Sequence, residues 1–162
     1  RGMTDTKGRR IKRSISIDIK TIKFCDELLL KKLAKFVELK DHIAEKKKEI
    51  ELENKKQKIN QDDLIASGLT NVGLLRQYIF NYLKDHKGIR DDLTFLIRQL
   101  QPGQSGLPIE IYVFTNDTDW VNYENIQSDI FDHLLAVLPA FDLSAFQIIS
   151  DNNDQVKRIK DK

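Results

Sequence analysis

The chain has 162 residues, of which 40% are hydrophobic and 32% charged, and its formal net charge is +2. This length suits one ordinary domain, or a small domain with a large insertion. The small net charge argues against a domain that binds polyanions with its whole surface. Cys25 is the single cysteine, which excludes an intrachain disulfide and a cysteine-based zinc site, and no apolar run is long enough to cross a bilayer.

Basic side chains are concentrated at the start of the chain. Residues 1–23 carry eight of them against two acids, a net charge of +6, which leaves −4 for the remainder. Such a cluster can meet phosphate, anionic lipid head groups or an acidic neighbour. The alternative, which we favour, is a solvated strand edge that Lys and Arg keep soluble. The candidates for a basic membrane- or partner-facing surface are Lys7, Arg9, Arg10, Lys12 and Arg13.

The first predicted elements are a strand and a long helix. Isoleucines alternate with polar residues from Ile11 to Lys20, and this period of two predicts a strand. From about Phe24, apolar residues recur at spacings of three, four and seven, which predicts one helical stripe. The members of the stripe are Leu29, Leu33, Phe36, Ile43 and Ile50.

The charged middle of the chain follows Ala44. Lys and Glu dominate it, with opposite charges four residues apart, so we expect a protruding solvated helix or a mobile arm. A coiled-coil partner face is the weaker alternative, because lysines interrupt its seam. The range 40–68 is therefore interpreted as a charged helical insertion and linker.

The remainder of the chain supplies five more elements. An apolar stripe from Val72 to Leu83 predicts a helix with Asn71 as its N-cap. A Pro- and Gly-rich connection suited to a hairpin joins two predicted strands, Leu93–Leu100 and Leu107–Thr115. A third helix is expected from about Asp119 to Leu138, ended by Pro139. A last strand, Leu143–Ile149, precedes a polar tail at 150–162 that is expected to be frayed.

When the first two predicted helices and the charged insertion between them are counted as one helical connection, this order is strand, helix (with an insertion), strand, strand, helix, strand. It predicts an α+β fold, the ferredoxin-like βαββαβ sandwich, as a single domain over 1–162. Its sheet is four-stranded and antiparallel with both helices on one face, and the insertion lies in the first crossover.

The two faces of the predicted sheet have similar compositions. Both registers of the hairpin strands are rich in apolar residues, although one face of such a sheet ordinarily meets water. A large exposed apolar face usually marks an interface, so this domain is not expected to work alone. The candidate subunit-interface residues are Leu96, Leu100, Tyr112, Phe114 and Phe146.

Two groups of acids raise the question of a catalytic or metal site. Asp117 and Asp119 stand where a strand ends and a helix begins, so helix capping is the favoured interpretation. Asp129 and His133 are one turn apart and are interpreted as a surface pair, because two ligands do not make a specific metal site. Glu110 is expected to pair with Arg98 across the hairpin. No cofactor, metal or small-molecule substrate is predicted.

The aromatic residues Tyr112 and Phe114 on a ferredoxin-like sheet raise the possibility of RNA recognition. A ferredoxin-like RNA-binding module needs a basic-Gly-aromatic-Gly/Ala-Phe-Val motif on an inner strand. The strand Ile109–Phe114 carries an acid instead and lacks that motif. The sequence therefore disfavours nucleic acid as a partner.

Several linked motifs occur in sequence along the chain. They are Gly8–Ser14, Leu69–Gly73 with Arg76 and Tyr78, Arg98–Gly103, Gly106–Thr115, Trp120, Tyr123-Glu124, Ile126-Gln127 and Asp129–His133. This series resembles the cytoplasmic C-terminal domain of bacterial small-conductance-type mechanosensitive channels, and most of all the miniconductance branch. The resemblance runs from about Gly8 to Gln147, while Lys40–Lys58 carries none of it and is interpreted as a branch-specific insertion.

The resemblance implies a homo-oligomer, typically a heptamer, with upstream transmembrane helices in the bacterial inner membrane and this domain in the cytoplasm. Such channels open under membrane tension on hypo-osmotic shock, and the family has no catalytic residues. The alternative function is a free-standing ferredoxin-like interaction or regulatory module that binds nucleic acid through the basic start at 7–13. An enzyme is the third possibility and would need a ligand at the Asp129–His133 pair.

Overall fold

The computed structural model describes residues 8–57 and 68–148, so Lys7, the end of the insertion and the polar tail lie outside the described residues. In chain order the elements are β1 (Arg10–Ile17), a 3-10 helix (Ile19–Thr21), α1 (Glu27–Leu33), α2 (Lys40–Gln57), α4 (Asn71–Lys84), β2 (Ile89–Arg90), β3 (Leu96–Gln99), β4 (Leu107–Thr115), α5 (Trp120–Val137) and a second 3-10 helix (Leu138–Phe141).

The sheet is built around β4. β1 runs antiparallel along one side of it, with Arg10 opposite Phe114 and Ile17 opposite Leu107. β2 and β3 both pair antiparallel with its other side, one after the other. A single bridge joins Ala145 to Ile17 on the free edge of β1. The spatial order of last segment, β1, β4 and β3 is that of the ferredoxin-like sandwich, and the predicted fold class is confirmed.

The two edges of the sheet differ in detail from the prediction. The last strand is reduced to the Ala145 bridge and two flanking hydrogen bonds, because the chain leaves the edge after Phe146, and Ile148 is 68% exposed. On the opposite edge, β2 is an additional strand that the sequence pattern did not indicate. It pairs with the end of β4 that β3 does not reach.

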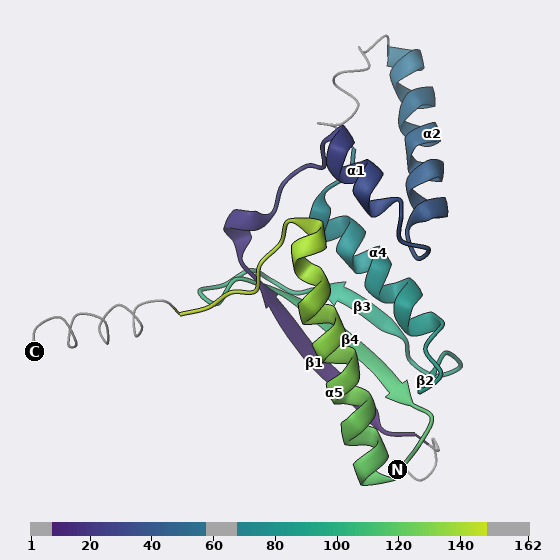
Figure 1. Ribbon diagram of the computed structural model, residues 1–162, viewed down its shortest axis with the longest axis vertical. Coiled ribbons are helices and arrows are strands. Elements are labelled where there is room, and N and C mark those ends of the chain that lie inside the picture. Colours follow the sequence, from purple (N-terminus) through teal and green to yellow (C-terminus); the bar gives the residue numbers. More distant parts are fainter. Residues whose placement is uncertain (1–7, 58–67, 149–162) are drawn as a thin grey trace, which may run out of the picture.

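Helices α4 and α5 lie over the same side of the sheet (Figure 1). The apolar residues of β1 and β4 that face them are 0–4% exposed and form one core with buried side chains of both helices. The main contributors are Ile11, Ile15, Ile17, Ile109, Ile111, Val113, Leu75, Ile79, Ile130 and Leu134. The period of two in the strands and the helical stripes therefore meet at one apolar layer.

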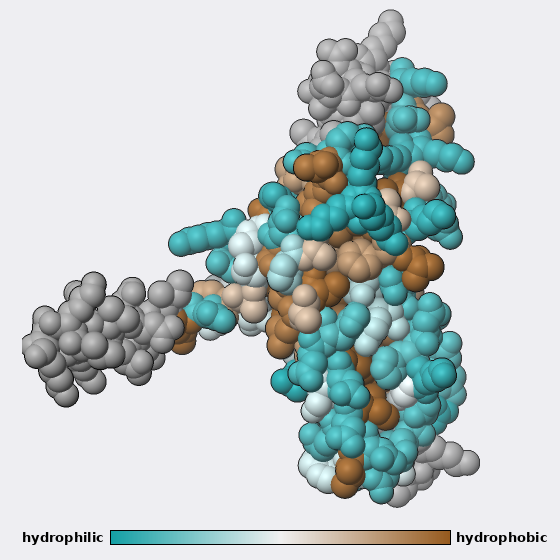
Figure 2. Space-filling view, viewed as in Figure 1, coloured by the Kyte–Doolittle hydropathy of each residue, from teal (hydrophilic) through white to brown (hydrophobic). Residues whose placement is uncertain are grey.

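The long helix predicted from Phe24 onward is wrong as a single element, because the chain turns between α1 and α2. Phe36 lies in that turn, and its ring centroid is 5.2 Å from that of Tyr78 and 6.0 Å from that of Phe141. The turn contains no Gly or Pro, so packing of Phe36 against these rings outweighs helix propensity. We call α1, the turn and α2 together (27–57) the helical arm; its distal part, α2, extends beyond the end of the sheet, and its visible surface is mainly hydrophilic (Figures 1 and 2).

Candidate assembly surface

All five predicted interface residues lie on the sheet face opposite the helices. Strand pleating places alternate residues on this face, and the register sets them in rows. Leu96 stands opposite Tyr112, whose other neighbour is Lys12, and Phe114 stands between Arg10 and Arg90. Leu100 and Phe146 lie at the other end of the face, on either side of Pro108 and Ser16.

The exposed part of this surface is smaller than the sequence predicted. Leu96 is 42% exposed, while Tyr112 and Phe114 are half-buried with ring centroids 6.1 Å apart. β1 contributes Lys12 and other polar residues to the same face. The expectation that both faces are largely apolar holds for the hairpin strands and is wrong for β1. An apolar centre with a charged rim is the usual composition of a protein interface.

One ion pair lies within this face. Arg98 Nε is 2.9 Å from Glu110 Oε1, as the sequence predicted. The Glu110 side chain is 8% exposed, whereas that of Arg98 is 49% exposed. A carboxylate that is this buried needs a cationic partner, because a charge removed from water is costly when unpaired. Arg98 therefore neutralises the Glu110 carboxylate within this face.

The predicted basic cluster is divided between the two faces of the sheet. The Arg9 guanidinium lies 4.9 Å from the centroid of the Trp120 ring, and that of Arg13 lies 4.4 Å from Phe131, both on α5. Arg10 lies on the helix-free face, 5.8 Å from the ring centroid of Tyr112, and Lys12 is exposed beside it. The predicted cluster has four members among the described residues. Because side chains alternate along a strand, only Arg10 and Lys12 of these four lie on the candidate surface.

The acids at the end of β4 cap α5, as predicted. Asp119 is the N-cap and accepts a hydrogen bond from the Asn122 backbone N–H, and Asp117 accepts one from the Asp119 N–H. The Asn122 side-chain amide donates to the second oxygen of Asp117. These bonds lower the pKa of the Asp117 carboxyl, with the Asp119 N–H as the larger cause. The acids satisfy the orphan donors of the helix start.

His133 belongs to a ring cluster between α4 and α5. Its Nε2 lies 2.7 Å from the Tyr78 hydroxyl, and its ring stacks on Tyr82 at a centroid distance of 4.3 Å. Burial raises the pKa of the Tyr78 hydroxyl to about 12. His133 therefore packs against α4, where the sequence had suggested a surface pair with Asp129. Within residues 8–57 and 68–148, no group of His, Cys and acidic residues has the arrangement of a metal site.

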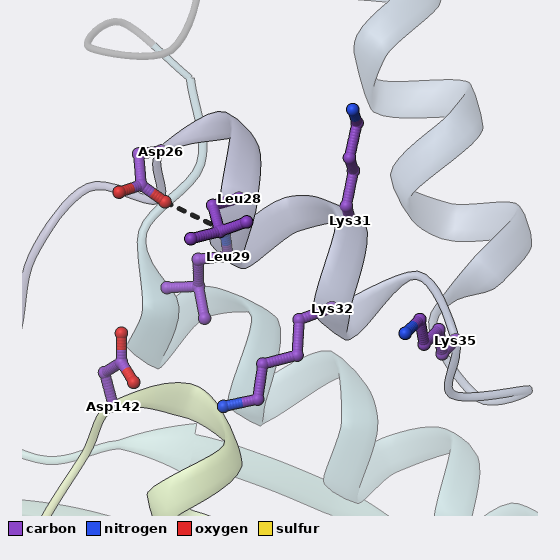
Figure 3. Close-up of a pocket in the computed structure, with 7 residues that line it drawn as sticks. All are labelled: Asp26, Leu28, Leu29, Lys31, Lys32, Lys35 and Asp142. Carbon is purple, nitrogen blue, oxygen red and sulfur yellow. Dashed lines mark hydrogen bonds between the residues drawn. The ribbon is translucent and has the colours of Figure 1, made fainter.

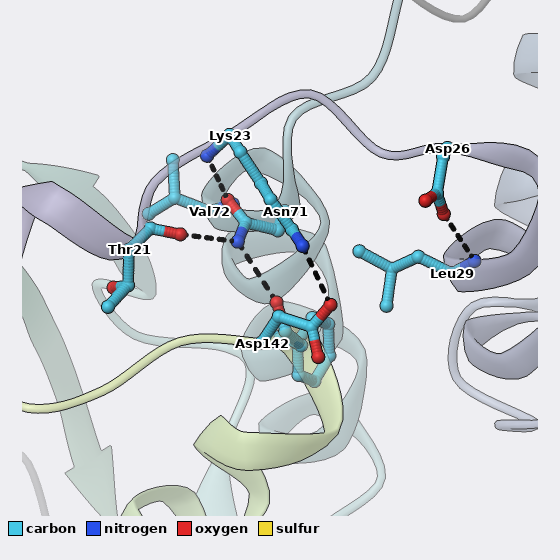
Figure 4. Close-up of polar contacts among 8 residues, drawn as sticks. Thr21, Lys23, Asp26, Leu29, Asn71, Val72 and Asp142 are labelled. Atoms are coloured by element: carbon cyan, nitrogen blue, oxygen red, sulfur yellow. Dashed lines mark hydrogen bonds and ion pairs between the residues drawn. The ribbon is translucent and has the colours of Figure 1, made fainter.

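Asn71 is a structural residue whose role the sequence prediction missed. The N-cap of α4 is Thr70, whose hydroxyl accepts from the Gly73 N–H, so the assignment of the cap to Asn71 was wrong. Asn71 is 0% exposed and donates from Nδ2 to the backbone oxygens of Thr21 and Phe141 (Figure 4). Its Oδ1 accepts from the Lys23 and Val72 N–H groups.

The Asn71 hydrogen bonds join three distant parts of the chain. They tie the start of α4 to the segment after β1 and to the segment after α5. The sequence does show two adjacent residues of the kind that cap helices, Thr70 and Asn71, at the start of α4. Which of the two turns inward depends on partners 50 and 70 residues away.

The fold and this surface define a ferredoxin-like α+β domain with an apolar and basic face that no helix of the described residues covers. The sequence model of the family described as "Mechanosensitive ion channel MscS, C-terminal" matches residues 11–145. The chain belongs to this family. It is the cytoplasmic C-terminal domain of a mechanosensitive ion channel, in a family of oligomeric membrane channels. None of the helices among the described residues is both long enough and apolar enough to span a membrane.

Proposed function

We propose that this domain forms part of the wall of a cytoplasmic vestibule in a channel of the bacterial inner membrane. The complete channel is a homo-oligomer, a heptamer of the miniconductance branch, that opens under membrane tension during hypo-osmotic shock. The domain acts passively by shaping the vestibule and joining subunits. No nucleic acid, cofactor or small-molecule substrate enters this role.

The observation that carries the proposal is the clustering of all five candidate interface residues on the helix-free face. Tyr112, Phe114 and Leu96 supply the apolar centre, and Arg10 and Lys12 supply a cationic edge. Burial of such a patch against a neighbouring subunit removes apolar area from water, and aromatic residues often dominate such contacts. Family membership over residues 11–145 supports the same conclusion.

Channel activity is tested by patch-clamp recording of the full-length protein in a bacterial host that lacks its own mechanosensitive channels. We expect tension-dependent openings that are absent from the empty-vector control. A protein that is inserted and oligomeric but silent under tension would contradict the gating role.

The interface is tested by replacing Tyr112 and Phe114 with Ser in the full-length protein. We expect assembly, measured by cross-linking, to weaken more than thermal stability, measured on the 162-residue domain. Val121→Ser is the matched control, because Val121 is 63% exposed on α5, away from this face. Equal losses in both assays would show that the two rings serve folding and not assembly.

The alternative, a free-standing module that binds nucleic acid, has less support. It requires the basic side chains at 7–13 to act together, but Arg9 and Arg13 lie against rings of α5 while Arg10 lies on the opposite face. Salt-dependent binding of the domain to duplex or single-stranded nucleic acid, lost on substitution of Arg10 and Lys12, would favour that alternative.

A further inference from the structure

A pocket beside α1 carries unpaired positive charge. It has a volume of about 480 Å³ and is lined by Leu28, Leu29 and three lysines, together with Asp26 and Asp142 (Figure 3). The pocket lysines are Lys31, Lys32 and Lys35.

The two acids of this pocket are already engaged. Asp26 caps α1 by accepting from the Leu29 N–H, and Asp142 pairs with Lys23 at 2.9 Å. The three pocket lysines form no ion pair with any residue in the described ranges 8–57 and 68–148. Leu28 stands beside them and is 78% exposed. The pocket therefore offers three cations and one leucine to a partner that is acidic and partly apolar.

The other helix of the arm, α2, carries a row of acids along one side. Asp41, Glu45, Glu49 and Glu53 follow one another at intervals of four residues and are all exposed. Like charges at this spacing lie next to each other on a helix and destabilise it, although Lys46 offsets part of this by pairing with Glu49 at 3.4 Å. Leu52 lies next to this acidic row and is 63% exposed.

The acidic row faces away from the pocket of its own chain. Ile43 is buried in the core and Lys47 contacts Glu27 of α1 at 3.7 Å, so this side of α2 faces α1 and the core. At about 100° per residue, Glu45 lies on the opposite side of the helix from both. A second copy of the chain is therefore the partner that can bring the acidic row to the lysine pocket.

We propose that the acidic row and Leu52 of α2 dock into the Lys31–Lys35 pocket of a neighbouring subunit. The contact joins two different surfaces, and such heterologous contacts close into rings when the rotation permits. α2 has eighteen helical residues, about 27 Å of helix, and extends beyond the end of the sheet (Figure 1). The inference rests on the proposed oligomeric channel and gives the insertion a role in subunit contacts.

Cysteine cross-linking in the full-length protein tests the contact. Two differently tagged copies, one with Leu28→Cys and one with Leu52→Cys, are co-expressed in membranes and treated with a short bismaleimide. We expect a product that carries both tags and requires both cysteines. Val37→Cys replaces Leu28→Cys in the matched control, because Val37 is 82% exposed and does not line this pocket. The native Cys25 is 0% exposed and should contribute little background.

Charge reversal then tests whether the pairing is specific. Lys31→Glu with Lys35→Glu should lower the yield of the Leu28–Leu52 product about fivefold or more, as should Glu45→Lys with Glu49→Lys. The two reversals combined should restore it. Lys20→Glu with Lys87→Glu, at two exposed positions outside the pocket and α2, is the charge-matched control and should leave the yield unchanged.

The outcomes separate this inference from the proposed function. An intact oligomer on a native gel without the cross-link, or without an effect of reversal, would overturn the docking and leave the channel proposal standing. In a copy that carries both Leu28→Cys and Leu52→Cys, a cross-link formed only within that chain would show that the arm covers its own pocket, which also contradicts the docking. Failure of the full-length protein to form any oligomer would overturn both.

Discussion

Helices α4 and α2 come from the same chain but are stabilised in different ways. Seven of the 14 residues of α4 are buried, and six of them belong to the continuous apolar core that includes the sheet. Of the 18 residues of α2, Ile43 near its start joins the core, while Leu52 is 63% exposed. Tertiary packing therefore stabilises α4, whereas α2 depends on local propensity and on ion pairs such as Lys46–Glu49. We therefore expect substitutions of buried residues in α4 to lower the free energy of unfolding more than substitutions in α2.

The largest effect is expected for Asn71→Ala. The change leaves the Lys23 N–H and the Thr21 and Phe141 carbonyls without their partner in a partly buried place, which should cost about 3 kcal/mol or more of unfolding free energy. Asn125→Ala, at an exposed position of α5, is the control and should change it by less than about 0.5 kcal/mol. Urea unfolding of the domain measures both, and similar values would refute the role of the Asn71 bonds.

A core truncation compares the two helices directly. Ile79→Ala in α4 removes a side chain that is 0% exposed and should destabilise the domain by about 3 kcal/mol through lost burial and a cavity. Leu52→Ala in α2 should change stability by less than about 0.5 kcal/mol. The same urea titrations give both numbers. A large effect at Leu52 would mean that α2 is packed within the isolated domain.

The ion pair Arg98–Glu110 of the sheet should contribute more to stability than the exposed pair Lys46–Glu49 of α2. Arg98→Ala leaves the buried Glu110 carboxylate unpaired and should cost about 1–2 kcal/mol, reduced by the partial exposure of Arg98. Adding Glu110→Gln should recover part of that loss. Lys46→Ala breaks an exposed pair and should cost less than about 0.5 kcal/mol. Thermal melts of the four variants, including Glu110→Gln alone, give the coupling energy, and a value near zero for Arg98–Glu110 would contradict the argument.

Deletion of Lys46–Gln57 should leave a domain that melts cooperatively. The deletion removes the exposed Leu52 and the half-buried Ile50 and breaks the Lys47–Glu27 contact, so we expect a loss of about 1 kcal/mol or less. Calorimetry and circular dichroism measure it. Collapse of the cooperative transition would show that the arm is part of the folding unit.

The smallest effect concerns pH. Burial lowers the pKa of His86 below its ordinary value of 6.5, and its Nδ1 accepts a hydrogen bond from the Gly88 N–H. The unfolded chain therefore takes up the proton first, so this contribution is complete above pH 6.5 and is lost as the pH falls toward the lower folded pKa. Between pH 7.5 and 5.5, His86→Asn should lose about 1–2 °C less in Tm than the native domain. An equal loss in both would exclude His86 as the cause.

The sequence predicted those features that repeat along short stretches. Strand β4 was predicted with the bounds Leu107–Thr115 that it has in the structure, and the caps at Asp117 and Asp119 follow from their position before an apolar stripe. The Arg98–Glu110 pair follows from the hairpin register. Each depends on neighbours along one strand, one helix end or one hairpin, where spacing alone fixes geometry.

Other features depended on contacts between distant segments. The turn at Phe36 is set by rings at Tyr78 and Phe141, and the inward orientation of Asn71 is set by the backbone at Thr21 and Phe141. The sequence pattern indicated neither, because a helical stripe continues through Phe36 and a capping residue precedes the next helix at either position.

By itself the sequence determined the α+β order, the apolar layer and the placement of five apolar residues on a second sheet face, because period and alternation are local properties. The tertiary structure decided which side chains remain available on that face. It divided the basic cluster between two faces, turned His133 toward α4 and folded the arm back at Phe36. These outcomes arise from packing between segments far apart in the chain, where many side chains compete for the same core and local preference no longer decides.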